Sequence, residues 1–222
     1  QQRLEEALHH LTGETIRVTG ASRTDSGVHA LGQRVHFDTR SRIPADKYPF
    51  ALNTCLPPDI RVLEGKEVSG EFHARFDAKG KRYTYRIHNA PHASALYRNI
   101  TAHVPYKLDV ERMRNALPDL LGTHDFAAVR SVGTDVKSTV RTVYYYNVER
   151  IGNVIQLKVC ANGFLYNMVR AMVGTVVYAA EGKLAPEDIP DILDSGNRTL
   201  AGPTVPPGGL YMTKLWYNED VL

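Results

Sequence analysis

Hydrophobic positions in the first half of the chain recur at helical spacing in some segments and alternate in others. Leu4, Ala7, Leu8 and Leu11 would share one face of a helix over residues 1–12. A second helix is predicted over residues 44–55, ended by Leu56-Pro57-Pro58. Alternation of apolar and polar residues predicts strands over residues 15–20, 32–39, 59–68 and 80–88.

The second half repeats this kind of pattern. Asp109 suits the N-cap of a helix reaching residue 121, followed by a turn over 122–126. Gly152-Asn153 predicts a hairpin between two long strands. The expected elements are strands over 98–104, 139–150, 153–161 and 210–217, helices over 163–182 and 186–194, and a loop over 202–209.

A helix–strand–strand order therefore occurs in both halves, with no low-complexity linker between them. We predict an α+β fold of two ferredoxin-like halves, residues 1–105 and 106–222, with merged antiparallel sheets and helices packed on one side. An active-site cleft between the two halves is expected, because ligands commonly bind where two such units meet.

Composition narrows the class of protein. No apolar run approaches the roughly 20 residues that a membrane span needs, and no secretory signal opens the chain. Two cysteines, Cys55 and Cys160, are too few for a disulfide framework, which favours a cytoplasmic protein. Residues 1–108 carry 16 Lys and Arg against 11 Asp and Glu, a basic balance compatible with nucleic-acid binding.

The run Arg23-Thr24-Asp25-Ser26-Gly27 lies between two predicted strands. A carboxylate on a tight loop, oriented by a nearby arginine, suits a nucleophile or a general base. Gly27 would allow a backbone turn that most residues cannot adopt. The alternative is an ordinary Asx-turn with a surface Arg–Asp pair, which is common turn chemistry.

Two other residues have both a structural and a functional interpretation. Tyr83 lies on a predicted strand, where tyrosine is favoured for packing alone, but it could also stack on a base. Arg170 lies in an apolar helix and either snorkels to the surface or pairs with an acid such as Asp25. His29, His36 and His73 lie on different predicted elements and form no recognisable ligand pattern, so no metal site is expected.

Four ordered motifs carry a resemblance to a known family. They are the segment 21–30 around Asp25, Phe72-His73-Ala74-Arg75-Phe76, Lys81-Arg82-Tyr83-Thr84-Tyr85, and the segment 162–174 containing Arg170. The closing segment 206–211 also fits. Together they span nearly the whole chain, which resembles the TruA family of tRNA pseudouridine synthases.

The resemblance implies a specific activity: isomerisation of uridine to pseudouridine at positions 38, 39 and 40 of the tRNA anticodon stem-loop. It implies Asp25 as the nucleophile and Tyr83 as the residue that stacks on the target base. Arg23 and Arg170 would lie near the carboxylate, one holding RNA or displacing the base pair and the other pairing with Asp25. No cofactor or metal is expected, since the reaction involves neither redox change nor hydrolysis.

The resemblance further implies a homodimer in which one tRNA contacts both subunits. It also implies a strand ahead of the first helix, which is absent from this sequence, and Ser26 stands where a smaller residue such as Ala is usual. Two hypotheses of other classes remain: a catalytically silent RNA-binding module that uses Arg and Tyr, and a metal-dependent hydrolase that uses the histidines.

Overall fold

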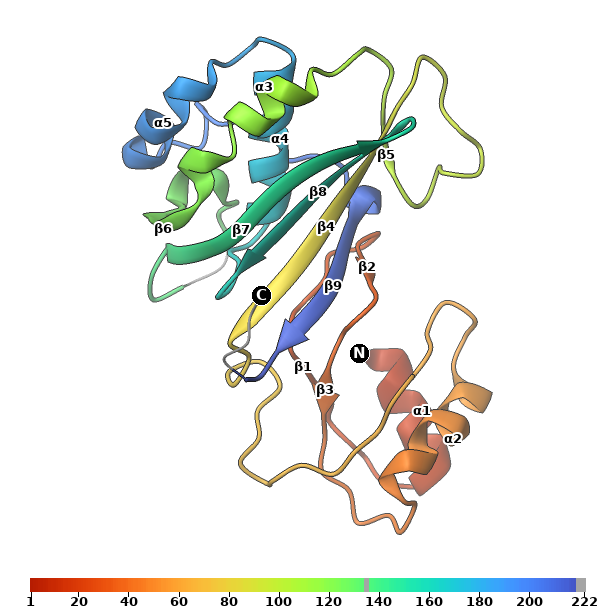
Figure 1. The fold of residues 1–222 in the computed structure, drawn as a ribbon. Helices are drawn as coiled ribbons and strands as arrows, with labels where there is room; N and C mark the ends of the chain where they lie inside the picture. Colours follow the sequence, from red (N-terminus) through yellow and green to blue (C-terminus); the bar gives the residue numbers. More distant parts are fainter. Residues whose placement is uncertain (134–135, 219–222) are drawn as a thin grey trace. The chain divides into compact units, whose positions relative to one another are not determined.

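The computed structural model describes residues 1–133 and 136–218 and confirms the predicted α+β class (Figure 1). The chain folds into two compact units, each built from two stretches of sequence. The first unit comprises Gln1–Arg23 and Gln33–Asp77. The second unit comprises Thr24–Gly32 and Ala78–Leu222, so the segment that carries Asp25 belongs to the second unit.

The first unit is built around two helices, α1 (Gln2–Thr12) and α2 (Tyr48–Cys55). α1 ends at Gly13, whose φ of 73° places it in the left-handed region that favours glycine. Two short strands, β1 (Thr19–Gly20) and β3 (Val35–His36), pair antiparallel. The helices bury their apolar faces in a small core made of Ala7, Leu8, Ile16, Val18, Tyr48, Leu52 and Leu56.

The second unit is organised by a seven-stranded sheet in the order β2-β9-β4-β8-β7-β6, with β5 also paired with β4. Its strands are β2 (His29–Ala30), β4 (Gly80–Asn89), β5 (Ala102–Val104), β6 (Gly122–Asp125), β7 (Val140–Ile151), β8 (Val154–Ala161) and β9 (Leu210–Trp216). The β2–β9 and β4–β5 pairs are parallel and the others antiparallel. The sheet is therefore mixed: most pairs are antiparallel, as the sequence predicted, but the β2–β9 and β4–β5 pairs are not.

Helices α3 (Val110–Asn115), α4 (Met168–Ala180) and α5 (Ile189–Ser195) lie on one face of this sheet (Figure 1). α4 is apolar on nearly all sides and is buried over most of its length. Alternate side chains of the strands, such as Tyr85, Ile87 and Leu157, pack in the same core as α4. Asp109 caps α3 as predicted, accepting hydrogen bonds from the backbone N–H groups of residues 111 and 112.

Two glycines let the backbone of residues 202–203 lie directly against α4. A Cβ on Gly174 would lie 1.8 Å from the Pro203 carbonyl oxygen, and one on Gly202 would lie 2.3 Å from the backbone of Gly174. The Gly202 N–H also donates to Thr175 Oγ1 (3.0 Å). This contact fixes the segment after residue 202 against the helix that carries Arg170.

Several elements differ from the prediction. Residues 59–68 form no strand, because the Asn53 side chain bonds both backbone groups of Val62, at 2.8 Å each. The turn expected over 122–126 is instead the edge strand β6, paired with β7. Helix α4 begins at Met168 rather than Gly163, because Asn167 has a φ of 58° and cannot continue a helix. The boundary expected at 105/106 does not coincide with the two units, because β4 pairs with β8 and β9, and β2 pairs with β9.

Candidate active site

Asp25 lies in the loop that joins β1 to β2. A turn closed by the Val28 N–H bonding the Asp25 carbonyl (3.0 Å) shapes this loop. Gly27 has a φ of 84°, in the region that side chains other than glycine rarely adopt, and a Cβ there would lie 3.2 Å from Pro207 Cγ. The Asp25 side chain is 38% exposed, so its carboxylate is both held by the protein and open to a ligand.

Replacing Gly27 with Ala is expected to displace this loop. A Cβ costs about 1–2 kcal/mol in the left-handed region, and here it would also press on Pro207. We expect kcat for a reaction at Asp25 to fall about tenfold or more, because small displacements of reacting groups are costly. Unfolding free energies and kcat for both the variant and the parent protein check this.

Gly13→Ala provides a matched control for Gly27→Ala. Gly13 has a similar φ of 73°, but no atom lies within 4 Å of the Cβ position. Gly13→Ala should therefore lower the unfolding free energy by a similar amount and leave kcat unchanged. Equal losses of kcat in the two variants would show that general destabilisation, not loop position, is responsible.

Arg170, in the first turn of α4, connects three parts of the second unit. Its Nη1 donates to Asp25 Oδ2 (3.1 Å) and to Asn167 Oδ1 (2.8 Å), and its Nε donates to the Val205 carbonyl (2.7 Å). The side chain is 14% exposed, so this charge is largely withdrawn from water and depends on these partners. The arginine thereby joins the Asp25 loop to α4 and to the segment that precedes β9.

Asn167 orients Arg170 from the position just before α4. It is the one non-glycine residue with positive φ (58°) among the residues that the structure describes. Its Oδ1 accepts from Arg170, its Nδ2 donates to Ser131 Oγ (2.9 Å), and its carbonyl accepts from the Ala171 N–H (2.9 Å). An asparagine tolerates this backbone better than most residues, so one side chain both starts the helix and anchors the arginine.

Asn167→Ala and Asn167→Gly separate these two roles. Both variants remove the Oδ1 that accepts from Arg170, but only alanine retains the backbone cost of positive φ. We expect alanine to be less stable than glycine by about 1 kcal/mol, while kcat falls several-fold in both. A kcat that recovered in the glycine variant together with stability would assign the effect to the backbone and not to the amide.

Tyr83 and Tyr85 lie on the same face of β4, next to this group. The Tyr85 hydroxyl donates to the Pro206 carbonyl (2.7 Å), and burial raises the pKa of Tyr85, so the phenol stays protonated and can donate. Tyr83 meets the Phe164 ring edge-to-face with centroids 5.1 Å apart. Tyr83 is 6% exposed, so a base can stack on it only after a neighbouring group moves.

The other candidate residues, Arg23, His36 and His73, belong to the first unit. Arg23 is exposed and belongs to the first unit, whereas Asp25 belongs to the second. His36 and His73 lie in the first unit with ring centroids 4.9 Å apart, and each accepts a backbone N–H at Nδ1. Within residues 1–133 and 136–218, no three His, Cys, Asp or Glu side chains come together to hold an ion.

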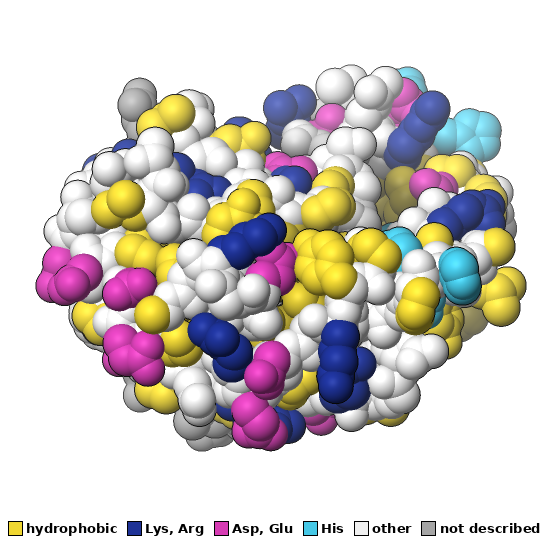
Figure 2. Space-filling view, turned by 90° about the horizontal axis from the view of Figure 1, so that it is seen from above, with side chains coloured by type: hydrophobic (Ala, Val, Ile, Leu, Met, Phe, Trp, Pro, Cys, Tyr) yellow, Lys and Arg dark blue, Asp and Glu magenta, His cyan; other side chains and the backbone are white. Residues whose placement is uncertain are grey.

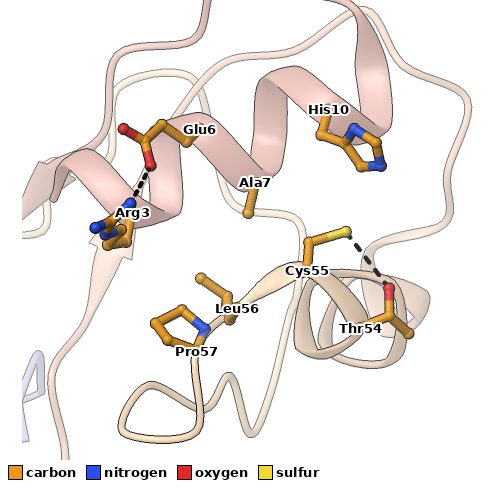
Figure 3. Close-up of a pocket in the computed structure, with 8 residues that line it drawn as sticks. All are labelled: Arg3, Glu6, Ala7, His10, Thr54, Cys55, Leu56 and Pro57. Carbon is orange, nitrogen blue, oxygen red and sulfur yellow. Dashed lines mark hydrogen bonds and ion pairs between the residues drawn. The ribbon is translucent and has the colours of Figure 1, made fainter.

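A separate hollow of about 670 Å³ lies on the first unit, between α1 and the end of α2 (Figure 3). Its lining residues are Arg3, Glu6, Ala7, His10, Thr54, Cys55, Leu56 and Pro57. Arg3 pairs with Glu6 (3.0 Å), and the Cys55 thiol lies 3.5 Å from Thr54 Oγ1. This hollow includes none of the predicted site residues.

Charged side chains of both signs are mixed on the face drawn in Figure 2. Figure 2 shows Lys and Arg side chains interspersed with Asp, Glu and hydrophobic side chains across the face that it draws. None of the described helices is long and apolar enough to cross a bilayer.

The fold and the site define a mixed α+β protein whose loop carboxylate is held by a largely buried arginine, an arrangement suited to nucleophilic or acid–base catalysis. The family model described as tRNA pseudouridine synthase matches residues 1–77 and 116–218. The chain belongs to this family.

Similar proteins agree with that assignment. The chain is 48% identical over 217 residues to "tRNA pseudouridine synthase A" of Acetivibrio thermocellus, covering 98% of this chain and 89% of that protein. It is also 48% identical to the protein of the same name from Thermoanaerobacter sp., with the same coverage. The protein of that name from Bacillus pumilus is 42% identical over 221 residues, covering 99% of this chain and 90% of that protein.

Proposed function

We propose that this protein converts uridine to pseudouridine in tRNA and that Asp25 is the nucleophile. The observation that carries the proposal is the contact between Asp25 and Arg170. Arg170 Nη1 lies 3.1 Å from Asp25 Oδ2, although the two residues are 145 positions apart in the sequence. The fold brings together the motif that contains Asp25 and the motif that contains Arg170. A nucleophile that works without a metal requires a carboxylate that is held by a counter-ion and stays accessible to the substrate.

The reaction breaks the N1–C1′ bond of uridine and forms a C5–C1′ bond on the same uracil. One proton leaves C5 and one reaches N1, so no electron donor, acceptor or water is consumed. Asp25 would attack the nucleotide or abstract a proton from the sugar, and its position on a loop open to solvent allows either route. Arg170 would stabilise the carboxylate and keep it in place while the uracil is detached and turned.

The target base must leave its stack before Asp25 can reach it. Leaving the stack costs a few kcal/mol, and stacking on an aromatic side chain returns about 1–3 kcal/mol per base. We assign that stacking to Tyr83, and its low exposure means that entry of the base displaces a neighbour such as Phe164. Arg23, exposed and two residues before Asp25 in the sequence, is assigned to holding the RNA.

The finer parts of the proposal follow the family resemblance. They are modification at positions 38, 39 and 40 of the anticodon stem-loop, a homodimer in which tRNA contacts both subunits, a cytoplasmic location and two ferredoxin-like halves. Light scattering with and without tRNA tests the dimer directly.

The proposed activity is tested by incubating the protein with unmodified tRNA and mapping pseudouridine along the product. We expect pseudouridine at one or more of the positions 38, 39 and 40. Binding of tRNA without any product would instead favour a catalytically silent RNA-binding module. Product outside the anticodon arm would contradict the positional assignment while leaving the isomerase activity intact.

A further inference from the structure

His29 lies four residues after Asp25, where the loop enters β2. Its ring stacks on Tyr211 of β9, with centroids 4.6 Å apart and planes inclined by 16°. Its Nε2 lies 2.8 Å from the carbonyl oxygen of Asn99. Because a carbonyl can only accept, His29 must carry its proton on Nε2, which defines the tautomer of a neutral ring.

Tyr211 is itself fixed from several directions. Its hydroxyl donates to the Ile100 carbonyl (2.6 Å), and the Arg86 guanidinium lies 4.5 Å from the centre of its ring. Its backbone pairs in parallel with His29. His29 and Tyr211 thus bind successive carbonyls of the connection between β4 and β5, which ties that connection to the end of the Asp25 loop.

The Asp25 loop consequently meets the segment 205–211 at three points. Arg170 links Asp25 to Val205, Gly27 lies against Pro207, and His29 stacks on Tyr211. The first two contacts hold the carboxylate and the middle of the loop. The third holds the point at which the loop becomes a strand.

We propose that His29 is a positioning residue for the reaction: through its bond to the Asn99 carbonyl and its stack on Tyr211 it fixes the strand end of the loop and so the place of Asp25. The inference rests on the proposed role of Asp25 as nucleophile. A partly exposed stacked ring contributes modestly to stability, whereas a shift of about 1 Å in a reacting group costs roughly 100-fold in rate. His29 should therefore matter more to kcat than to folding.

Two substitutions separate the ring of His29 from its hydrogen bond. His29→Phe keeps a ring against Tyr211 but cannot donate to Asn99, and His29→Gln keeps a donor near the position of Nε2. We expect His29→Phe to lower kcat about 10- to 100-fold, with KM and the Kd for tRNA within about twofold of the parent protein. His29→Gln should recover a large part of that loss.

His103→Phe is the matched control. His103, on β5, makes the same kind of bond, from Nε2 to the Ala90 carbonyl at 2.8 Å, at the other end of the same connection. Its ring lies against the Ala90 carbonyl and the His88 ring, and neither belongs to the Asp25 loop, so kcat should be unchanged. A comparable loss in His103→Phe would overturn the inference, since it would show that the connection as a whole is responsible.

Imidazole nitrogen chemical shifts give a readout independent of rate, and the His29 signal, assigned by its loss in His29→Gln, should show a protonated Nε2. A tautomer with only Nδ1 protonated would overturn the inference. So would a kcat for His29→Phe within twofold of the parent, or a loss confined to tRNA affinity. Asp25→Asn is measured in parallel: if it stays active, the nucleophile assignment fails, whereas if it is inactive and His29→Phe is not impaired, only this inference fails.

Discussion

Asp25→Asn is expected to abolish pseudouridine formation while leaving tRNA binding intact. The amide oxygen of asparagine can still accept the hydrogen bond from Arg170, which is 3.1 Å long in the native protein. The amide cannot, however, act as a nucleophile or a base. Losing such a group typically lowers kcat by roughly 10⁴-fold or more. Single-turnover assays on unmodified tRNA, with a filter-binding Kd, measure both quantities.

Asp59→Asn is a suitable control for that experiment. Asp59 is an exposed acid on a loop of the first unit, so its amide variant makes the same change in net charge without altering a residue of the site. It should keep the activity of the parent protein. Normal product from Asp25→Asn would contradict the assignment of Asp25 as nucleophile. A loss of tRNA binding as large as the loss of rate would assign Asp25 to tRNA recognition instead of catalysis.

Arg170→Met is the second change with a large expected effect. It leaves the Val205 carbonyl and Asn167 Oδ1 without their donor and removes the counter-ion of Asp25. Unsatisfied groups of this kind cost about 1–3 kcal/mol, so the unfolding free energy should fall by that order. We expect kcat to fall about 100- to 1000-fold, as when a preorganised electrostatic partner is removed.

Arg170→Lys tests whether charge alone is sufficient. Lysine restores a cation but not the planar fork that serves three oxygens on three segments, so it should recover stability better than rate. Combining Arg170→Met with Asp25→Asn completes a double-mutant cycle. Strictly additive losses in ln kcat would show that the two residues act separately and would contradict their assignment as one catalytic pair.

Local sequence patterns predicted those elements whose partners are close in the chain. Gly152-Asn153 between two alternating segments predicted the β7–β8 hairpin, and Asp109 predicted the start of α3. Residues 59–68 alternate as a strand should, but a strand also needs a partner, and Val62 has its backbone groups occupied by Asn53. Alternation records which side chains are buried, not which backbone groups are paired.

For the site as well, the sequence identified side chains but not the contacts between them. The motifs were enough to select Asp25 and Arg170, but no periodicity indicates that residues 145 positions apart meet. The partners that sequence reasoning missed are mostly backbone groups, the carbonyls of Val205 and Asn99, and these carry no side-chain signal. Asn167 lies within the motif 162–174, and an asparagine just before an apolar helix is a sequence clue to a positive φ.

The parallel pairing of β2 with β9 has a consequence for how the protein is made. His29 and Tyr211 pair across about 180 residues of sequence, and closing so long a loop is slow compared with forming hairpins or helix turns. During synthesis the Asp25 loop emerges well before residues 205–211, the segment that receives it. The carboxylate is thus set in place only after that later segment has been made, and a chain interrupted before it carries the Asp25 motif without the contacts that position it.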